Sequence, residues 1–205
     1  TGLIVELGES ILRKACHQAQ AWAAAGLPPV KMAVNISPRQ FQGGLVEQIR
    51  TALKETGLPA SLLEIEITET LIIQDVDASV RIMRAIKDMG VSLALDDFGV
   101  GYSCLGMLKT FPLSCMKIDR SFLAHLPGNA KDSAIVSIMI QLASSLGIDV
   151  IAEGVETGEQ AKFLRDAGCP CGQGYYFSPP VPAQAIEAML AQSPIFPNGA
   201  SEASR

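Results

Sequence analysis

The sequence lacks any apolar run of roughly 18 residues, the length that a membrane-spanning helix needs. Its most hydrophobic stretch, residues 135–152, is interrupted by Gln141, Ser144, Ser145 and Asp149. It also lacks a basic segment followed by an apolar one, which is the pattern of a secretion signal. We therefore expect no membrane span in this chain and a cytoplasmic location.

Cysteine, histidine and clustered positive charge are also scarce. The five cysteines are an odd number without regular spacing, so we expect reduced thiols rather than a disulfide framework. Cys169 and Cys171 have no second pair to complete a zinc site, and His17 and His125 are badly placed to help. The net charge is -5 and no cluster of Lys and Arg occurs, which argues against nucleic-acid polymers as partners. A small anion could still bind through bridging cations.

The remaining composition is that of one compact domain. The chain has 205 residues, of which 48% are hydrophobic and 18% are charged, and its mean hydropathy is +0.28. These values exclude intrinsic disorder and allow a sizeable core. Because strand-like and helix-like segments alternate without a break in composition, we predict a single domain over residues 1–192. Residues 193–205 carry turn formers and little periodicity, so we expect a flexible tail there.

Apolar periodicity predicts six strands separated by helices. The strands are expected at residues 31–37, 62–69, 91–97, 115–119, 149–153 and 172–177. The helices are expected at residues 3–25, 45–56, 78–89, 104–110, 132–146, 159–167 and 183–190. Five glycines follow these helices as expected C-caps, namely Gly26, Gly57, Gly90, Gly147 and Gly168. The strand spacing suits parallel strands joined by crossover helices, as in a barrel or a doubly wound sheet.

The predicted strands are apolar on one face only. In residues 62–69, for example, Ile65 and Ile67 alternate with Glu64 and Glu66. A sheet with helices on both faces would bury such carboxylates without partners, at a cost on the order of several kcal/mol each. A barrel with helices outside, a polar interior and a site at the C-terminal ends of its strands explains the pattern better. The predicted fold class is therefore α/β, a (β/α)8 barrel.

Polar side chains collect at the predicted C-terminal ends of the strands. They are Asn35, Glu66, Glu69, Asp96, Asp97, Lys117, Glu153, Glu156 and Gln173. Carboxylates that converge on one amine cannot all stay ionised unless cations neutralise them. Carboxylate and amide oxygens without imidazole suit Mg²⁺ or Mn²⁺ rather than zinc. Two ions that share Asp96, with Asp97 beside it, would activate water and hold a phosphodiester, so we predict metal-assisted phosphoryl hydrolysis.

Each of these residues also has a structural alternative. The pair Asp96 and Asp97 could form a turn or an N-cap, and the glutamates after residue 65 could be a solvated strand end. Glu156 overlaps a helix start at which Thr157 and Gln160 resemble a capping box. The glycines of the segment from Gly99 do not make up a nucleotide-binding fingerprint. We predict a mobile loop there.

Lys117 has two further alternatives. It could pair with Asp119, which lies two residues further along the same strand face. On a barrel strand it could also form a Schiff base, as in an aldolase. An amine among so many carboxylates should stay protonated, which counts against Schiff-base chemistry.

Six motifs in order and spacing resemble those of a known family. They are VNIS around Asn35, EITE from Glu66, DDFGVGYS from Asp96, KIDRSF from Lys117, AEGVET around Glu153 and QGYYFSPP from Gln173. Up to about Leu190 the chain resembles the EAL domain, the cyclic di-GMP phosphodiesterase of bacterial signalling proteins. This resemblance implies a modified triose-phosphate-isomerase-type barrel that hydrolyses cyclic di-GMP to the linear dinucleotide pGpG with Mg²⁺ or Mn²⁺.

The same resemblance implies a role for each site residue. Asn35, Glu66 and Asp96 would ligate one metal ion, and Asp96 with Asp97 the second. Lys117 would hold the attacking water or a phosphate oxygen, and Glu153 would be a general base or contact a metal-bound water. Glu69 would anchor the loop after Asp97. Glu156 and Gln173 would complete the site.

Two departures from the family pattern are visible. The Glu-Ala-Leu triplet that names the family is absent, and its glutamate is a metal ligand there. We therefore expect a barrel truncated to about six strands, as part of a longer protein in which sensor or cyclase domains lie upstream. If these residues are all that exists, we expect a catalytically impaired module that binds cyclic di-GMP or another protein. The second departure, Val100, could alter loop dynamics or contacts in a homodimer.

Overall fold

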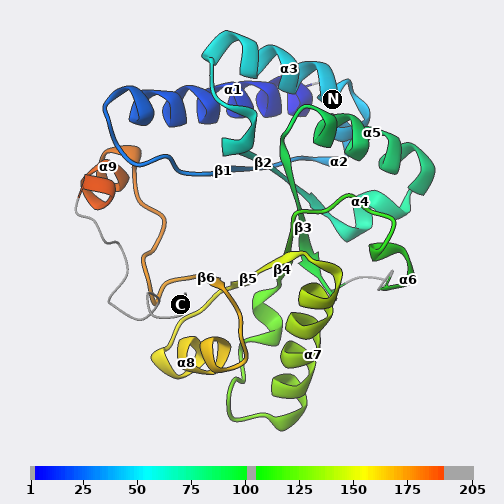
Figure 1. The fold of residues 1–205 in the computed structure, drawn as a ribbon, viewed down its shortest axis with the longest axis vertical. Helices are drawn as coiled ribbons and strands as arrows, with labels where there is room; N and C mark the ends of the chain where they lie inside the picture. The colour runs from blue at the N-terminus through cyan, green and yellow to red at the C-terminus, as the bar shows by residue number, and fades with distance from the viewer. Residues whose placement is uncertain (1–2, 101–104, 192–205) are drawn as a thin grey trace, which may run out of the picture.

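The computed structural model describes residues 3–100 and 105–191. It contains a six-stranded sheet in the order β1-β2-β3-β4-β5-β6, in which every pairing is parallel. The strands are β1 (Met32–Asn35), β2 (Leu63–Thr68), β3 (Ser92–Phe98), β4 (Cys115–Ile118), β5 (Asp149–Glu153) and β6 (Cys171–Gln173). The sheet curls into a partial barrel (Figure 1). The predicted α/β barrel truncated to six strands is confirmed.

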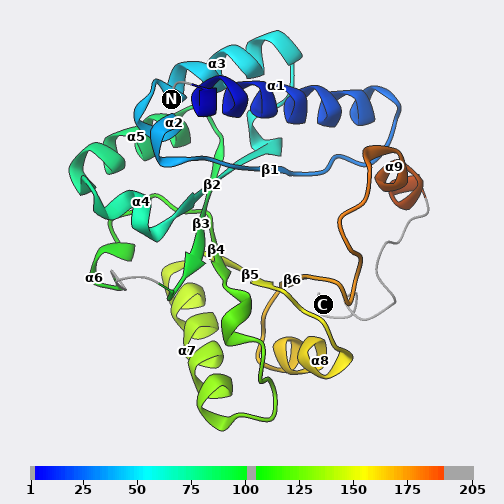
Figure 2. The ribbon, with the colours of Figure 1, turned by 180° about the vertical axis from the view of Figure 1, so that it is seen from behind.

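Helices connect the strands and lie outside the curl of the sheet (Figures 1 and 2). The α-helices are α1 (Leu3–Ala24), α2 (Pro38–Gln42), α3 (Leu45–Thr56), α4 (Glu69–Ile73), α5 (Val76–Asp88), α6 (Leu105–Leu108), α7 (Ala130–Leu146), α8 (Gly158–Asp166) and α9 (Ala183–Ala191). Two short 3-10 helices are η1 (Ala60–Leu62) and η2 (Arg120–Phe122). Helix α9 returns to the C-terminal end of α1, where Trp22 Nε1 donates a hydrogen bond to Glu187 Oε1 at 3.0 Å.

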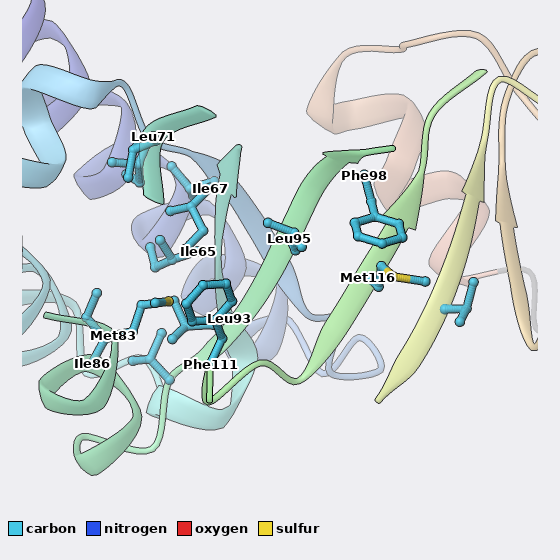
Figure 3. Close-up of a cluster of buried hydrophobic side chains, with 14 of the residues drawn as sticks. Ile65, Ile67, Leu71, Met83, Ile86, Leu93, Leu95, Phe98, Phe111 and Met116 are labelled. Atoms are coloured by element: carbon cyan, nitrogen blue, oxygen red, sulfur yellow. The ribbon is translucent and has the colours of Figure 1, made fainter. Parts of the chain in front are cut away.

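The hydrophobic core lies between the outer face of the sheet and these helices. Figure 3 shows side chains of β2 and β3, such as Ile65 and Leu93, packed against Met83 and Ile86 of α5. All four side chains are fully buried. The alternate residues of the same strands face the inside of the curl, as the one-sided apolar pattern predicts. The inner face is therefore free to carry polar groups.

Local sequence signals explain where the helices begin and end. The five predicted C-cap glycines all have positive φ, between 68° at Gly147 and 87° at Gly90. The capping box of α8 is also confirmed, because Thr157 Oγ1 accepts from Gln160 N and Gln160 Oε1 accepts from Thr157 N. Helices α5 and α7 start two residues before the predicted positions. Their N-caps, Asp75 and Asn129, accept hydrogen bonds from backbone N–H groups of the first turn.

Three parts of the chain differ from the sequence prediction. Helices α2 and α4 were not predicted, because five residues are too few to show a helical period. The last strand was predicted to run to Phe177, but β6 ends at Gln173. The chain turns back there, since Tyr176 N donates to Val155 O and Phe177 N donates to Gly174 O.

Some predictions fall on residues that the structure does not describe. The tail at residues 193–205, Cys104 and Gly101 are among them. Within residues 3–100 and 105–191, no helix is both long enough and apolar enough to cross a bilayer.

Candidate functional site

Lys117 lies at the centre of three carboxylates on the inner face of the sheet. Its Nζ is 2.7 Å from Glu66 Oε1, 2.7 Å from Glu153 Oε1 and 3.2 Å from Asp96 Oδ1. The Lys117 and Glu66 side chains are only 5% and 7% exposed. The structure thus brings together four of the nine predicted site residues. They come from four successive strands.

The register of the strands explains this convergence. Glu66 is paired with Ala94, so Asp96 lies two residues beyond it on the same face of β3. Lys117 is the penultimate residue of β4, and Glu153 ends β5. Since parallel strands present their C-terminal ends at one edge, all four inward side chains meet there. The alternation of side chains along each strand places all four on the inner face, and the curl of the sheet brings them close together.

Burial and the ion pairs shift the pKa values of Lys117 and Glu153. Burial alone would lower the pKa of Lys117, but hydrogen bonds with Glu153 and Glu66 outweigh it, so the pKa is raised. Lys117 is therefore protonated at neutral pH, which argues against a Schiff-base nucleophile. Burial raises the pKa of Glu153 despite the opposing effect of Lys117. A carboxylate with a raised pKa is a better proton acceptor than an ordinary one.

Asp97 continues the cluster toward solvent. It is exposed, its φ is 54°, and its backbone N–H donates to Asp96 Oδ1 at 3.1 Å. Partial burial, and then the negative charges of Asp96 and Asp119, raise its pKa. A positive φ is uncommon for a residue with a side chain, and Asp tolerates it better than most. The backbone here turns the Asp97 carboxylate away from the direction that a continuing strand would give it.

Asp119 is a residue that sequence reasoning considered only as a partner for Lys117. The ion pairs of Lys117 go instead to Glu66, Asp96 and Glu153. Burial alone would raise the pKa of Asp119, but hydrogen bonds with Ser121 and Arg120 outweigh it, so the pKa is lowered. Asp119 also acts electrostatically on Asp97, so it belongs to the same acidic cluster. Its position two residues after Lys117 on the same strand face was the available signal.

Asn35 and Gln173 end the two edge strands of the sheet. Asn35 is paired with Glu66, and Gln173 is paired with Glu153. Both residues are exposed, and neither side chain forms a hydrogen bond with another described residue. Both lie at the correct edge, one strand away from the Lys117 cluster. Their predicted roles as metal ligand and site residue stay predictions.

Glu69 and Glu156 lie further from the Lys117 cluster along the chain. Glu69 begins α4, is 4% exposed and lines a cavity of about 10 Å³ together with Leu95, Phe98 and Leu108. Phe98 directly precedes the loop that Glu69 is predicted to anchor. Glu156 is exposed, and its backbone N–H donates to Gln160 Oε1 at 2.7 Å. The structural reading of this segment as a helix start is therefore confirmed, and the predicted roles of both side chains stay predictions.

The donor atoms of the site suit a divalent cation in kind. Glu66, Asp96 and Glu153 present three carboxylates to one ammonium, and Asp97 adds a fourth carboxylate nearby. Oxygen donors with excess negative charge are what Mg²⁺ and Mn²⁺ require. Within residues 3–100 and 105–191, however, no three His, Cys, Asp or Glu side chains are arranged to hold a metal ion. Instead, the Lys117 ammonium holds the carboxylates together.

The cysteines take no part in the site. Cys16, Cys115, Cys169 and Cys171 are free thiols. Burial, and then the nearby Glu64, raises the pKa of Cys115 to about 12, so this thiol stays protonated. None of the four described cysteines is paired in a disulfide, and their reduced state stays a prediction.

A partial (β/α) barrel with a lysine and four carboxylates at the C-terminal edge of its sheet defines a class of barrel proteins with acidic sites. The chain belongs to the EAL domain family, whose family model matches residues 1–180. The predicted resemblance is therefore confirmed.

Curated relatives from Pseudomonas aeruginosa share much of this sequence. The cyclic di-GMP phosphodiesterase NbdA is 39% identical over 92% of this chain and 24% of its own length. The bifunctional diguanylate cyclase/cyclic di-GMP phosphodiesterase MucR is 43% identical over 93% of this chain and 28% of its own length. The chain thus spans about a quarter of the length of these relatives.

Solved structures show the same fold. The MucR phosphodiesterase in complex with c-di-GMP has a TM-score of 0.87 at 43% identity, covering 91% of this chain and 76% of that chain. The EAL domain of Mycobacterium smegmatis DcpA has a TM-score of 0.88 at 39% identity, covering 92% of this chain and 85% of that chain. The curled sheet is therefore the arrangement found in solved EAL domains.

Proposed function

We propose that this chain is the catalytic part of a metal-dependent phosphodiesterase that hydrolyses cyclic di-GMP to pGpG in bacterial second-messenger signalling. The observation that carries the proposal is the contact of Lys117 Nζ with Glu66, Asp96 and Glu153 at the C-terminal edge of the sheet. Relatives named as cyclic di-GMP phosphodiesterases support the substrate. The structural neighbour in complex with c-di-GMP supports it as well.

Asn35, Glu66, Asp96 and Asp97 would hold the metal ions in this proposal. Divalent ions bound there would lower the pKa of water and offset the charge of the phosphodiester. We propose Mg²⁺ or Mn²⁺, because every donor is an oxygen atom. Titration calorimetry with MnCl₂ tests the assignment, with Asp96→Asn as the variant that should weaken binding. Equal Mn²⁺ affinity in both proteins would contradict a role for Asp96.

Lys117 and Glu153 would perform the chemistry beside these ligands. The protonated Lys117 ammonium would orient the attacking water or a phosphate oxygen, as its raised pKa allows at neutral pH. Glu153 would accept a proton from the water, since its own pKa is raised toward the range of a useful base. Glu69 would anchor the loop after Asp97, and Glu156 and Gln173 would contact the substrate.

Chromatography of pGpG formed from cyclic di-GMP tests the proposal. A parent protein that includes the segments preceding Thr1 should form pGpG with Mg²⁺ or Mn²⁺, and Glu66→Ala or Lys117→Ala should abolish the product. As a matched control, Lys162→Ala removes an exposed lysine whose ion pair with Asp166 lies on α8. Unchanged activity of the Glu66→Ala variant would defeat its assignment.

A non-catalytic module that binds cyclic di-GMP or another protein is the second candidate. The observation that favours it is that Lys117 already neutralises part of the carboxylate charge in this chain. Calorimetry would support this alternative if cyclic di-GMP bound tightly while no pGpG accumulated with either metal.

The wider setting is also proposed. A cytoplasmic location is supported by the four free cysteines, because thiols persist in reducing compartments. Upstream sensor or cyclase domains are supported by the bifunctional relative, of which this chain covers 28%.

A homodimer is supported by α7, which exposes Ile135 and Ile138 and has no charged residue from Ser133 to its end at Leu146. Exposed apolar faces of this kind often mark interfaces.

A further inference from the structure

Arg120 stands at the rim of the acidic cluster without a role in the chemistry described so far. It begins η2, directly after Asp119 and three residues after Lys117. The residue is exposed, whereas Lys117 is buried and held by three carboxylates. Among the described residues, no ion pair or hydrogen bond engages the Arg120 guanidinium. It is therefore an available cation at the edge where the site opens.

The residue that follows β5 packs closely against the stem of Arg120. A Cβ built on Gly154 would lie 2.4 Å from Arg120 Cβ and 3.4 Å from its Cα, so only glycine allows this approach. Gly154 has a φ of 71° and directly follows Glu153. The side chain of Arg120 thus starts from a fixed point beside the proposed base.

The charges around Arg120 are those of the site itself. Arg120 acts electrostatically on Asp119, and Asp119 acts on Asp97. A phosphodiester that approaches these carboxylates meets a negative surface, and Lys117 is too deeply buried to offset it at the rim. An exposed guanidinium supplies the missing positive charge. Its planar set of donors also matches two phosphate oxygens at once.

We propose that Arg120 is a substrate-binding residue whose guanidinium binds a phosphate group of the cyclic dinucleotide at the rim of the site. This inference rests on the proposed function, since it takes the phosphodiester as the ligand. Binding of the phosphate by Arg120 would hold the dinucleotide beside Lys117 and Glu153 with equal strength in the ground state and in the transition state. The bond-breaking chemistry is left to those two residues.

A purely structural role would be to screen Asp119. That role predicts a loss of folding stability when Arg120 is replaced, without a selective change in ligand affinity. The phosphate role predicts weaker ligand binding that depends on salt, because phosphate contacts are electrostatic. Affinity and its salt dependence therefore separate the two roles.

The test compares Arg120→Gln, Arg120→Lys and the control Arg84→Gln in the parent protein. Arg84 is exposed on α5, which packs outside the sheet. We expect Arg120→Gln to raise the KM, and the calorimetric Kd for cyclic di-GMP, by about tenfold or more, with kcat within about twofold of wild type. Arg120→Lys should recover part of the affinity, because it keeps the charge but loses the paired donors. Raising the salt concentration should reduce the difference in Kd between Arg120→Gln and wild type.

The outcomes separate this inference from the proposed function. If wild type binds cyclic di-GMP and Arg120→Gln binds with unchanged KM and Kd, the role of Arg120 is overturned while the function stands. If Arg120→Gln and Arg84→Gln weaken binding equally, the effect is not specific to the rim and the inference is likewise overturned. If wild type neither binds nor hydrolyses cyclic di-GMP, the proposed function falls, and this inference falls with it.

Discussion

At the scale of single residues, the molecule depends on Lys117. Its ammonium offsets part of the charge of three carboxylates that would otherwise repel one another. The pKa of Lys117 is raised above its ordinary value of 10.5. For a cation, a raised pKa means that the stabilisation is fully present below the unfolded value and is lost as the pH rises through the folded value. The wild-type cluster should therefore keep this stabilisation throughout the neutral range.

Lys117→Met should destabilise the chain in a manner that depends on pH. The substitution leaves Glu66, Asp96 and Glu153 without their cation, so we expect a loss of about 3–5 kcal/mol at pH 7.5. Without the ammonium, which opposes the effect of burial on Glu153, the pKa of Glu153 should rise further in the folded state. The folded variant then binds more protons than the unfolded one, and its stability falls as the pH rises. The loss should accordingly be smaller at pH 5.

Urea unfolding at both pH values, with divalent cations removed, measures the Lys117→Met effect. Lys162→Met is the control, because its ion pair with Asp166 is exposed and surface pairs contribute about 0–1 kcal/mol. An equal loss at pH 5 and pH 7.5 would show that lost packing, and not uncompensated charge, causes the effect.

Gly174→Ala is a second prediction at the residue scale. A Cβ at this position would lie 2.2 Å from Val155 O and 2.3 Å from Val155 N, and backbone atoms cannot move aside cheaply. We expect a loss of about 2–3 kcal/mol in the free energy of unfolding. Gly106→Ala is the control, because no atom of another described segment lies within 4 Å of its Cβ position and it is in a helix, so no loss is expected. Matching urea midpoints for the two variants would contradict the close approach at Val155.

At the scale of elements, some contacts are set by neighbouring residues in the chain and others by the tertiary fold. The capping box of α8 is local, since Thr157 and Gln160 satisfy each other across one helical turn. Gln160 Nε2 also donates to Leu123 O at 2.9 Å, which ties α8 to the segment after β4. Gln160 thus takes part both in the local cap of α8 and in a contact with the connection that follows β4.

Thr157→Ala should weaken α8 by removing its N-cap. Loss of the hydrogen bond from Gln160 N to Thr157 Oγ1 should cost about 1 kcal/mol of folding stability. Ser145→Ala is the control, because Ser145 Oγ only bonds back to Gln141 O on the exposed side of α7. Chemical denaturation followed by circular dichroism measures both variants. A Thr157→Ala protein as stable as Ser145→Ala would mean that the cap contributes nothing beyond Gln160.

At the scale of the whole molecule, the sheet separates two environments. Its outer face and the helices form one apolar core (Figure 3). Its inner face carries the charged cluster around Lys117. Outside this core, the part of α7 from Ser133 onward presents an uncharged surface with Ile138 62% exposed. Association with a second copy, in the homodimer that we propose, would remove this apolar surface from water.

Ile138→Lys should prevent self-association without unfolding the chain. Two lysines at a symmetric interface would be desolvated and would repel each other, so sedimentation should change from dimer to monomer. Unfolding free energy should stay within about 0.5 kcal/mol of wild type, because the substitution is at an exposed site. Arg84→Glu on α5 is the control for a change of surface charge. A wild-type chain that sediments as a monomer at all concentrations would refute the homodimer.

Prediction from the sequence succeeded where the signal was local or periodic. The six strands, the left-handed glycines that follow the helices and the capping box at Thr157 depend on neighbours in the chain, and the structure confirms them. It failed where the deciding contact was distant or the element short. Helix α4 was missed, and the predicted extension of β6 was wrong, because Tyr176 bonds to Val155 on a neighbouring connection.

The sequence by itself determined which residues face inward, because side chains alternate along a strand whatever the strand packs against. It therefore placed Glu66, Asp96, Lys117 and Glu153 at one edge of a parallel sheet. Only the tertiary structure decided which of them touch. The curl and register bring three carboxylates onto one ammonium, leave Asn35 and Gln173 at the edges, and bring Asp119 into the acidic cluster. Such contacts depend on distances between strands that are remote in the chain, and no local pattern encodes those distances.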